Sequence, residues 1–203
     1  RAEPRLRVIS RAAEGLVPAL NAGLAACRGR YVARMDADDI ASPHRLLRQI
    51  PLLEVDPTLA VVDGRAELFR DEGEVPEGMR LHQDWINAVL RPEDFERCFS
   101  VESPVFHPAA TFRRAAVVDL GGYRAVAGGP GIEPGPVPED YDLWLRLHAA
   151  GWRFRKVDEV LVEMRDRPSR LTRTHPAYSR EAFRRTRMIW LAQTRLASPR
   201  RVV

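Results

Sequence analysis

The stretch that decides how this chain folds is Tyr31-Val32-Ala33-Arg34-Met35-Asp36-Ala37-Asp38-Asp39, a short apolar run that ends in three carboxylates. Side chains two residues apart on an extended backbone point to the same side. We therefore expect Asp36 and Asp38 to converge at the exit of a strand while Ala37 faces away, with Asp39 as a further carboxylate nearby.

Carboxylates this close to one another raise each other's pKa unless a cation neutralises them. Mg²⁺ or Mn²⁺ binds to one or two protein carboxylates and takes further ligands from substrate phosphates. Asp36, Asp38 and Asp39 therefore predict a site for a divalent metal and a substrate that carries a diphosphate.

A plainer alternative stays open at this point. Asp38 and Asp39 would form a polar turn ahead of a helix that has Ser42 as its N-cap and Pro43 at its first position. An EF-hand loop is excluded, because Ala41 and Leu47 stand where its glycine and its bidentate glutamate belong.

The composition is that of a globular chain with its own core, since 45% of the 203 residues are hydrophobic and 30% are charged. The formal net charge is +4, and every basic residue except Lys156 and the histidines is arginine. A modest positive field favours anionic substrates such as nucleotides, or an anionic membrane surface, although an arginine-rich coding bias gives the same excess. No basic stripe interleaved with aromatic residues is present, so nucleic acid is not an expected partner.

The two cysteines, Cys27 and Cys98, lie far apart and outside any CxxC pattern, so neither a disulfide framework nor a zinc site is expected. No apolar stretch is as long as a membrane span, and the first residues do not read as a signal peptide. We expect a cytoplasmic location, with peripheral contact at the inner face of the membrane. The chain begins at Arg1 and closes on residues 201–203 as if a strand began there, so truncation at both ends is expected.

Hydrophobic periodicity predicts alternating strands and helices. A strand over 6–9, a helix over 14–28 and the strand with the acidic cluster would form a βαβ unit. Next come a helix over 43–55, a strand over 59–62, a polar loop over 70–80, two short helices within 81–99, an extended segment over 107–112 and a helix over 114–120. This alternation indicates the α/β class, with a mixed, mostly parallel sheet flanked by helices.

The composition changes between Gly122 and Pro138, which enclose a segment with five glycines and four prolines. It predicts a mobile or polyproline-like loop, of the kind that often acts as a lid or binding loop. A helix over 139–150 and strands over 154–157 and 160–164 should follow. The last predicted helix, over 176–196, is amphipathic and basic, and it would pack on the sheet or lie on a membrane surface.

A second acidic pair, Glu139 and Asp140, opens the helix that follows this loop. A catalytic base belongs in such a place, although acidic residues favour first helical turns for dipole reasons alone. Ligands in α/β folds bind outside the carboxyl ends of the strands, and both acidic groups lie beyond the ends of regular elements. We therefore expect the first group to hold metal and diphosphate and the second to hold a reacting hydroxyl, with His107 in the same crevice.

Taken in order, these motifs resemble the family 2 glycosyltransferases, which have the glycosyltransferase-A fold and move a sugar from a nucleotide diphosphate to an acceptor. The resemblance covers most of the chain. The matching parts are Gly15, Asn21-Ala22-Gly23 with Ala26, Gly29 to Asp39, Pro43 with Arg45 and Gln49, His107-Pro108, Phe112-Arg113, Gly121-Gly122-Tyr123, Glu139 to Arg146, Gly151, and Val160-Leu161-Val162 with Arg165.

The resemblance implies that Asp36 and Asp38 form the metal motif with Asp39 assisting, and that Asp140 is the acceptor-activating base beside Glu139. It implies an inverting single displacement, in which Mg²⁺ or Mn²⁺ stabilises the departing nucleoside diphosphate. The partners would be a nucleotide-diphosphate sugar and a glycan, lipid-linked or other hydroxyl acceptor, in cell-surface polysaccharide biosynthesis. Residues 1–175 would form the glycosyltransferase-A catalytic domain, and 176–203 a C-terminal helix with the start of a further segment.

The chain departs from the family pattern in two places. Nothing in residues 1–10 supplies the first strand and acidic motif that hold the nucleotide base and ribose, so that N-terminal segment is expected to be missing. Many relatives also carry a histidine two residues after the arginine matched by Arg165, where this chain has Arg167. Candidates for contacts to the diphosphate are Arg167, Arg170 and Arg173, and His175 is the candidate for the missing imidazole at the metal.

Two other functions remain open. A sugar-nucleotide nucleotidyltransferase shares a similar sheet and an acidic metal site, but it needs a Gly-rich basic N-terminal loop that is not visible here. A non-catalytic module that binds a glycan or a partner is the alternative from a different class. Glycan binding without nucleotide or metal dependence would distinguish that module from an enzyme.

Overall fold

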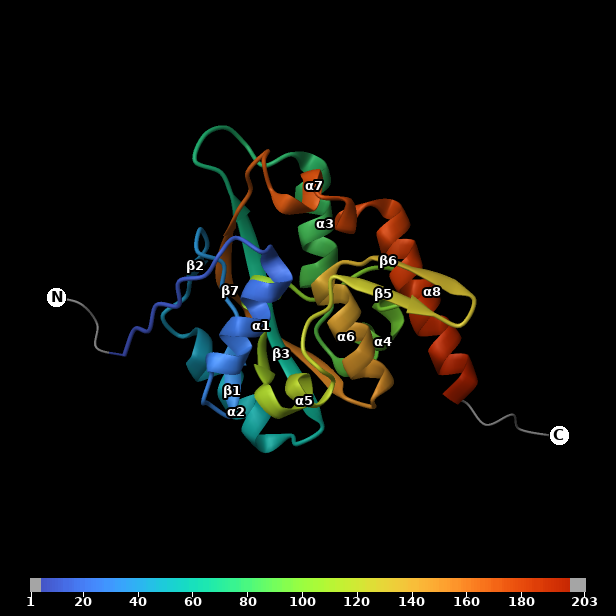
Figure 1. The fold of residues 1–203 in the computed structure, drawn as a ribbon. Coiled ribbons are helices and arrows are strands. Elements are labelled where there is room, and N and C mark those ends of the chain that lie inside the picture. Colours follow the sequence, from blue (N-terminus) through green and yellow to red (C-terminus); the bar gives the residue numbers. More distant parts are fainter. Residues whose placement is uncertain (1–4, 198–203) are drawn as a thin grey trace.

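The computed structural model of the chain describes residues 5–197; the expected start of a further segment, at residues 201–203, lies outside the described residues. A five-stranded sheet forms the centre (Figure 1). Its strands, in spatial order, are β1 (Tyr31–Ala33), β4 (Thr111–Arg113), β3 (Leu59–Phe69), β7 (Arg153–Arg165) and β2 (Ile40–Ala41).

The sheet is mixed, and the expected α/β class is confirmed. The expectation of a mostly parallel sheet is wrong for the part of the chain that the structure describes. Strands β3 and β7 are parallel, whereas the pairs β1 with β4, β4 with β3, and β7 with β2 are antiparallel. The reason is that β4 runs between β1 and β3 in the direction opposite to both of them.

The predicted strand over 6–9 is wrong. This segment has no regular structure, and Leu6 and Val8 are 70% and 81% exposed. A strand needs a neighbour to satisfy its backbone N–H and C=O groups, and no strand within residues 5–197 pairs with this segment. The expected βαβ unit is therefore absent from the described residues.

The long strands β3 and β7 extend further than the sequence pattern indicates. The two strands predicted over 154–157 and 160–164 form one strand, β7, because an irregularity accommodates residues 158 and 159 between Val157 and Val160. Opposite it lies Gly64 of β3, whose missing Cβ would be 2.6–2.8 Å from three atoms of the Leu161 side chain. The close approach of the two strands therefore depends on glycine at this position.

Seven helices lie near their predicted ranges. They are α1 (Leu16–Ala26), α2 (Arg45–Val55), α3 (Glu77–Asn87), α4 (Pro92–Cys98), α5 (Arg114–Asp119), α6 (Glu139–Ala149) and α8 (Arg180–Ala197). Helix α3 begins within the predicted loop over 70–80. The short helix α7 (Leu171–Thr174) and the 3-10 turns η1 (His107–Ala109) and η2 (Pro176–Tyr178) are not apparent in the sequence pattern.

The segment from 122 to 138 is not the mobile loop that its composition predicts. It contains an antiparallel hairpin of β5 (Val126–Gly129) and β6 (Ile132–Pro136), which lies beside α8 (Figure 1). Gly131, with a φ of +70°, allows the reversal of the chain between the two strands. Ala127 and Val137 pack against Ile189 of α8, so apolar burial holds the hairpin in place.

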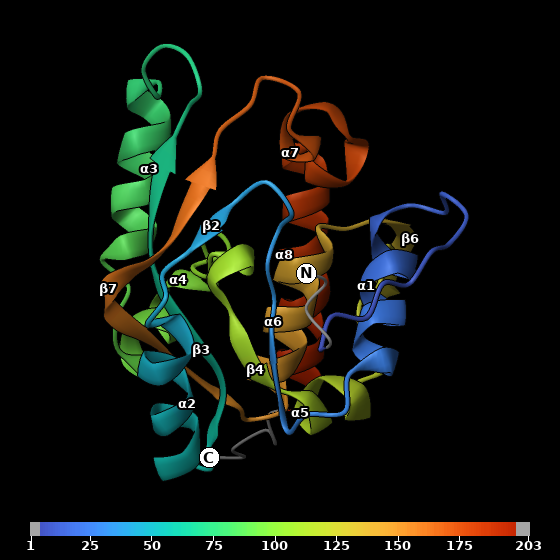
Figure 2. The same ribbon diagram turned by 90° about the vertical axis from the view of Figure 1, so that its left-hand side faces the viewer.

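The two faces of the sheet are covered by different helices (Figure 2). On one face, the fully buried Trp144 of α6 contacts the rings of Phe112 and Phe154. On the other face, Leu53 of α2 packs with Val62 of β3. Helix α8 packs against α6 and the hairpin, which confirms the packed alternative for the last helix. Within residues 5–197, no helix combines the length and the apolar character needed to cross a bilayer.

A buried polar cluster of α2 ties the sheet to η1. The Arg45 guanidinium donates to the carbonyl oxygens of Pro108 at 2.8 Å and Ala110 at 3.0 Å. The Gln49 amide donates to the carbonyl oxygen of Ala109 at 2.7 Å. Burial lowers the pKa of Arg45 to about 10, which leaves it charged at neutral pH. The backbone that follows His107 is therefore held by three hydrogen bonds from one helix.

The close packing at Gly64 makes a stability prediction. Gly64→Ala should lower the free energy of unfolding by about 1–3 kcal/mol, because the new methyl group overlaps the Leu161 side chain. Gly78→Ala is the matched control, because Gly78 lies in α3 with no atom within 4 Å of its missing Cβ, and alanine favours helix. Urea unfolding midpoints measure both variants, and equal midpoints for Gly64→Ala and the unsubstituted protein would contradict the packing.

Candidate active site

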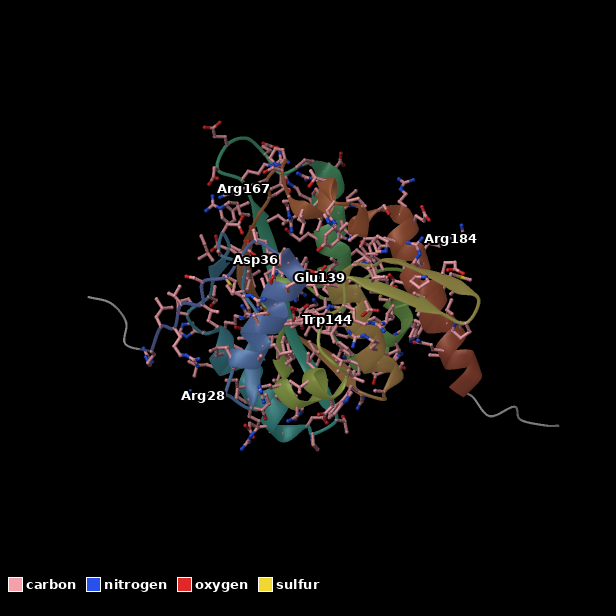
Figure 3. The ribbon with its side chains drawn as sticks, viewed as in Figure 1. Arg28, Asp36, Glu139, Trp144, Arg167 and Arg184 are labelled. Atoms are coloured by element: carbon pink, nitrogen blue, oxygen red, sulfur yellow. The ribbon has the colours of Figure 1, made fainter. Side chains whose placement is uncertain are left out.

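A cavity of about 980 Å³ lies between the turn that follows β1 and the beginning of α6. Eight of the residues that the sequence assigns to metal, diphosphate or acceptor line it: Asp36, Asp38, Asp39, Glu139, Asp140, Arg167, Arg170 and Arg173. His107 also lines it, as expected. Figure 3 shows Asp36, Glu139 and Arg167 on different elements of the fold. The structure thus brings the two acidic groups to one cavity, and the roles of these residues stay predictions.

The first acidic group lies in a turn and not on extended backbone. Strand β1 ends at Ala33, and the N–H of Asp39 lies 3.5 Å from the carbonyl oxygen of Asp36. The expected convergence by strand alternation is therefore wrong. The alternative of a polar turn describes this backbone correctly. Its predicted helix start, with Ser42 as N-cap and Pro43 at the first position, is wrong, because α2 begins at Arg45 with His44 as N-cap.

Arginines lie against two of the three carboxylates. Arg34 Nη1 lies 2.5 Å from Asp36 Oδ2, and Arg167 Nε lies 3.7 Å from Asp38 Oδ2. Arg165 of β7 donates through its Nε to the carbonyl oxygen of Asp38 at 3.0 Å. The turn is therefore joined to the end of β7, and its negative charge is only partly compensated by these arginines.

Asp39 has one carboxylate oxygen without a partner. Oδ1 accepts a hydrogen bond of 2.8 Å from the N–H of Arg165, whereas Oδ2 is buried with no hydrogen-bond partner among the described residues. Burial raises the pKa of Asp39, and the charges of Asp36 and Asp38 raise it further. An unpaired buried acceptor is costly unless a cation or a proton satisfies it.

The donor set fits a hard divalent cation that takes part of its shell from substrate. Within residues 5–197, no three His, Cys, Asp or Glu side chains are grouped so that they could hold a metal. Mg²⁺ typically binds to one or two carboxylates and completes its octahedron with water and phosphate oxygens. The unpaired oxygen of Asp39, with Asp38 beside it, meets this smaller requirement.

His175 is the one predicted metal ligand that the structure does not bring to the cavity. Its Nδ1 accepts a hydrogen bond of 3.2 Å from the N–H of Ala177, and it caps the turn η2. The sequence offered it as a replacement for the histidine that many relatives carry two residues after the arginine matched by Arg165. The turn of chain between α7 and α8 directs it elsewhere.

The second acidic group opens α6. Asp140 is half-buried, and its Oδ1 accepts a hydrogen bond of 2.7 Å from the N–H of Tyr141. Burial and the neighbouring charge of Glu139 raise the pKa of Asp140 to about 7. A carboxyl group with this pKa exchanges a proton readily at neutral pH, which is what a general base requires.

Glu139 is buried in a network with aromatic residues. It accepts a hydrogen bond of 2.6 Å from the hydroxyl of Tyr178, and its Oε1 lies 3.8 Å from His107 Nδ1. His107 Nε2 lies 2.9 Å from the hydroxyl of Tyr123. Burial lowers the pKa of His107 far below its ordinary value, so His107 is neutral at pH 7.

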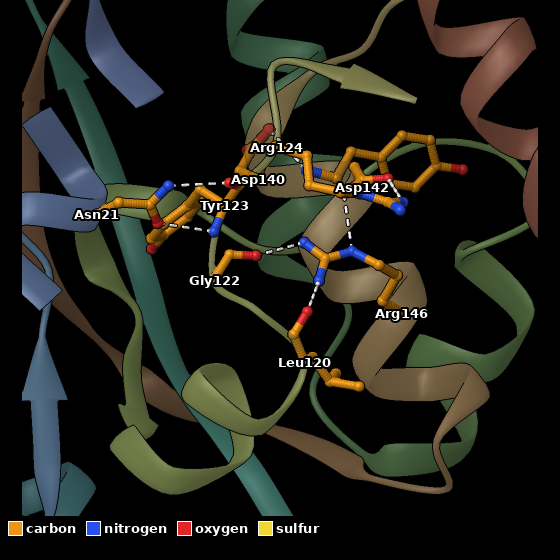
Figure 4. A network of polar contacts seen from close by, with 9 residues as sticks. Asn21, Leu120, Gly122, Tyr123, Arg124, Asp140, Asp142 and Arg146 are labelled. Atoms are coloured by element: carbon orange, nitrogen blue, oxygen red, sulfur yellow. Dashed lines mark hydrogen bonds and ion pairs between the residues drawn. The ribbon is translucent and has the colours of Figure 1, made fainter. Parts of the chain in front are cut away.

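A hydrogen-bonded network fixes the beginning of α6 (Figure 4). Asp142 accepts from Arg124 at 3.0 Å and from Arg146 at 2.8 Å, and Arg146 also donates to the carbonyl oxygens of Leu120 and Gly122. Because Arg146 lies one turn after Asp142, α6 is locked to the chain segment that carries Tyr123. These contacts hold the first turn of α6, the turn that also carries Asp140.

The arginine-rich segment after β7 is organised by one carboxylate. Asp166, whose side chain is fully buried, pairs with Arg70 at 2.6 Å and Arg173 at 2.8 Å, and Arg170 lies 3.9 Å away. Arg167 is half exposed and lies toward Asp38. Arg167 is thus the freest of the predicted diphosphate contacts, while Arg70 and Arg173 stabilise the segment.

Tyr178 and Arg34 contact the acidic groups of the cavity, and the sequence assigned a role to neither. Tyr178 belongs to η2, a turn too short to show in a pattern, and only the fold brings it to Glu139. Arg34 lies inside the first acidic stretch but without an assigned role. The sequence does contain an indication of its role. Arg34 is a charged residue between the apolar Ala33 and Met35 at the end of a strand, and a charged side chain in such a place usually has a partner nearby.

The raised pKa of Asp140 makes a stability prediction. The folded pKa of about 7 exceeds the unfolded value of about 3.9, so the protein should lose stability as pH rises between these values and remain constant above. Asp140→Asn keeps the acceptor oxygen but carries no charge. Its melting temperature should exceed that of the unsubstituted protein by a few degrees at pH 8, and by little at pH 4. An equal difference at both pH values would contradict the raised pKa.

Comparison with known proteins identifies the family of this chain. The family model of glycosyl transferase family 2 matches residues 1–121. The amylovoran biosynthesis glycosyltransferase AmsE of Erwinia amylovora is 33% identical over 151 residues, which are 74% of this chain and 50% of that protein. The UDP-Gal:alpha-D-GlcNAc-diphosphoundecaprenol beta-1,3-galactosyltransferase of Escherichia coli is 30% identical over 152 residues, 74% of this chain and 49% of that protein.

The chain spans about half the length of these curated relatives. Among solved structures, a mannosyltransferase PcManGT from Pyrobaculum calidifontis in complex with GDP-Man and Mn²⁺ is similar over 74% of this chain and 36% of that one, with 22% identity and a TM-score of 0.46. Because the family model covers more than half of the residues, this chain belongs to glycosyl transferase family 2.

Proposed function

We propose that this chain forms the reacting part of a glycosyltransferase that moves a sugar from a nucleotide-diphosphate donor to an acceptor hydroxyl with inversion. Membership of family 2 supports sugar transfer. The observation that carries the mechanism is that Asp140, with a pKa near 7, shares one cavity with the acidic turn. One group supplies a base and the other a place for the leaving diphosphate.

Asp140 takes the proton of the acceptor hydroxyl as that oxygen attacks the anomeric carbon of the sugar. A base positioned in this way typically contributes about 10²- to 10⁴-fold to the rate. Glu139, beside it, is held in place by the hydrogen bond that it accepts from the Tyr178 hydroxyl. The attack and the departure occur on opposite faces of the sugar, so a single displacement inverts the anomeric centre.

The departing nucleoside diphosphate belongs on the side of the acidic turn. A Mg²⁺ or Mn²⁺ ion bound by Asp38 and Asp39, with Asp36 beside them, would neutralise the charge that develops on the leaving phosphate. Arg167 and Arg170 line the same side and can contact phosphate oxygens directly. Asp36 contributes less directly, because Arg34 already compensates its charge.

The relatives support a carbohydrate acceptor. One takes part in amylovoran biosynthesis, and another acts on a GlcNAc unit linked to diphosphoundecaprenol. We include in the proposal an acceptor that is a glycan or a lipid-linked sugar, and a cytoplasmic location with contact at the membrane face. Membership of family 2 favours transfer over the nucleotidyltransferase alternative. The binding-module alternative is decided by the experiment below.

Asp38→Asn and Asp140→Asn test the binding of metal and diphosphate separately from the activation of the acceptor. The melting temperature is measured with UDP, GDP, TDP and CDP, each with and without Mn²⁺. We expect a metal-dependent rise with one nucleotide, because a ligand that binds only the folded state stabilises it. Asp38→Asn should abolish the rise and Asp140→Asn should retain it, while sugar transfer by the intact enzyme falls at least about 100-fold in both.

Asp119→Asn is the matched control, since Asp119 is exposed on α5 away from the cavity and should change neither readout. Near-normal transfer in both Asp38→Asn and Asp140→Asn would refute the mechanism. A cooperatively melting chain that responds to no nucleotide, but binds glycan without metal, would favour the binding module.

A further inference from the structure

Arg34 follows β1 directly and is fixed by its backbone. Its N–H donates to the carbonyl oxygen of Ala110 at 2.9 Å, in continuation of the pairing between β1 and β4. Its side chain is only 10% exposed and lines the cavity between the acidic turn and α6. A guanidinium in this position has little freedom to turn toward bulk water.

The guanidinium of Arg34 is not fully used by the protein. Nη1 is taken up by the ion pair with Asp36, whereas the buried Nε has no hydrogen-bond partner among residues 5–197. Arg65 and Arg114 also have a buried Nε without such a partner, but neither lines the cavity. Arg45, which is similarly buried, donates to two carbonyl oxygens and to Gln49. Arg34 therefore combines an unused donor, Nε, with access to the cavity.

The position of Arg34 between the two acidic groups indicates what this donor meets. Its guanidinium is paired with Asp36 of the turn. Asp140 and Tyr178 line the same cavity as Arg34, whose charge partly offsets the rise in their pKa values that burial causes. In a displacement, the acceptor oxygen bonds to the anomeric carbon while the bond from that carbon to the phosphate oxygen breaks, so the sugar lies between the base and the leaving phosphate. A cation near both is placed beside the phosphate that is attached to the sugar.

Two unmatched groups of opposite kind thus lie in the cavity at the acidic turn. Asp39 presents a buried acceptor without a donor, and Arg34 presents a buried donor, Nε, without an acceptor. A metal ion bound to a diphosphate satisfies both at once, with the cation at the carboxylate and an anionic oxygen at the guanidinium. Arginine suits this role, because its planar group binds phosphate oxygens through parallel N–H bonds.

We propose that Arg34 is a substrate-binding residue whose guanidinium donates to an oxygen of the sugar-linked phosphate of the donor. This assignment rests on the proposed function, since it takes the acidic turn as the diphosphate side. It adds a contact to the leaving group that comes from the strand end and not from the arginine-rich segment after β7. Such a contact strengthens as negative charge develops on that phosphate.

The test uses pyrophosphate with Mg²⁺ as the probe, because the nucleotide of the donor is not needed for this contact. Dissociation constants are measured by calorimetry for the unsubstituted chain, Arg34→Gln and Arg34→Lys. Loss of a charge-assisted hydrogen bond should raise the dissociation constant by about 10-fold or more in Arg34→Gln. Arg34→Lys keeps the charge beside Asp36 but not the planar fork, so it should bind with intermediate affinity.

A second measurement reads the contact in the unsubstituted chain itself. In ¹⁵N–¹H spectra of the unsubstituted chain, the Nε–H signal of Arg34 is identified by its absence from the Arg34→Lys spectrum. Mg²⁺ with pyrophosphate should shift this signal at the same concentrations that saturate binding. Arg184→Gln is the matched control, since Arg184 is exposed on α8 and lies away from the cavity (Figure 3). It should bind the probe normally.

The outcomes separate this inference from the proposed function. Normal affinity in both Arg34 variants with an unshifted Nε–H signal, together with loss of binding in Asp38→Asn, would overturn the role of Arg34 and leave the proposed function standing. No binding of the probe by the unsubstituted chain would overturn both. Weakened binding in the Arg34 variants with a shifted signal supports the assignment.

Discussion

The carbonyl oxygen of Ala110 accepts hydrogen bonds from the backbone N–H of Arg34 at 2.9 Å and from the guanidinium of Arg45 at 3.0 Å. At this one atom the end of β1, helix α2 and the segment after His107 meet. Buried backbone groups must be paired, and charged donors form the strongest such bonds. The distance between the acidic turn and the wall of the cavity at His107 therefore depends on the hydrogen bonds to this oxygen. The other residues of the site lie on the elements that these bonds join.

The site concentrates groups whose charges the protein does not balance. Asp39 has an unpaired buried oxygen, Arg34 has an unused donor at Nε, and Asp140 has a pKa near 7 because burial and Glu139 oppose its ionisation. Each of these features costs stability in the free protein. The surrounding contacts, including the network around Asp142 (Figure 4), hold them in place. Active sites commonly keep groups that lower the stability of the folded protein because the reaction needs them, and the rest of the structure compensates for this loss.

Much of the fold and most of the site follow from sequence patterns, and the failures have local causes. Helical periodicity located α1, α2 and α6, and the acidic pairs located both sides of the cavity. Periodicity cannot show whether a partner strand exists, so the apolar run at 6–9 was misassigned. Composition suggested a loop from 122 to 138, whereas packing against Ile189 makes a hairpin. Tyr178 and His175 lie close in sequence, and only tertiary structure places the former at the cavity and the latter outside it.

We propose that the acidic turn holds the metal on one side of a cavity whose other side carries Asp140. Paramagnetic broadening of backbone amide signals by Mn²⁺, in the presence of pyrophosphate, locates the bound metal. We predict saturable broadening centred on residues 36–39 and on Arg165, whose N–H contacts Asp39, with weaker effects at Asp140 and none at Arg184. Asp38→Asn should remove it. Broadening centred instead on the exposed carboxylates of residues 71–74 would contradict the account.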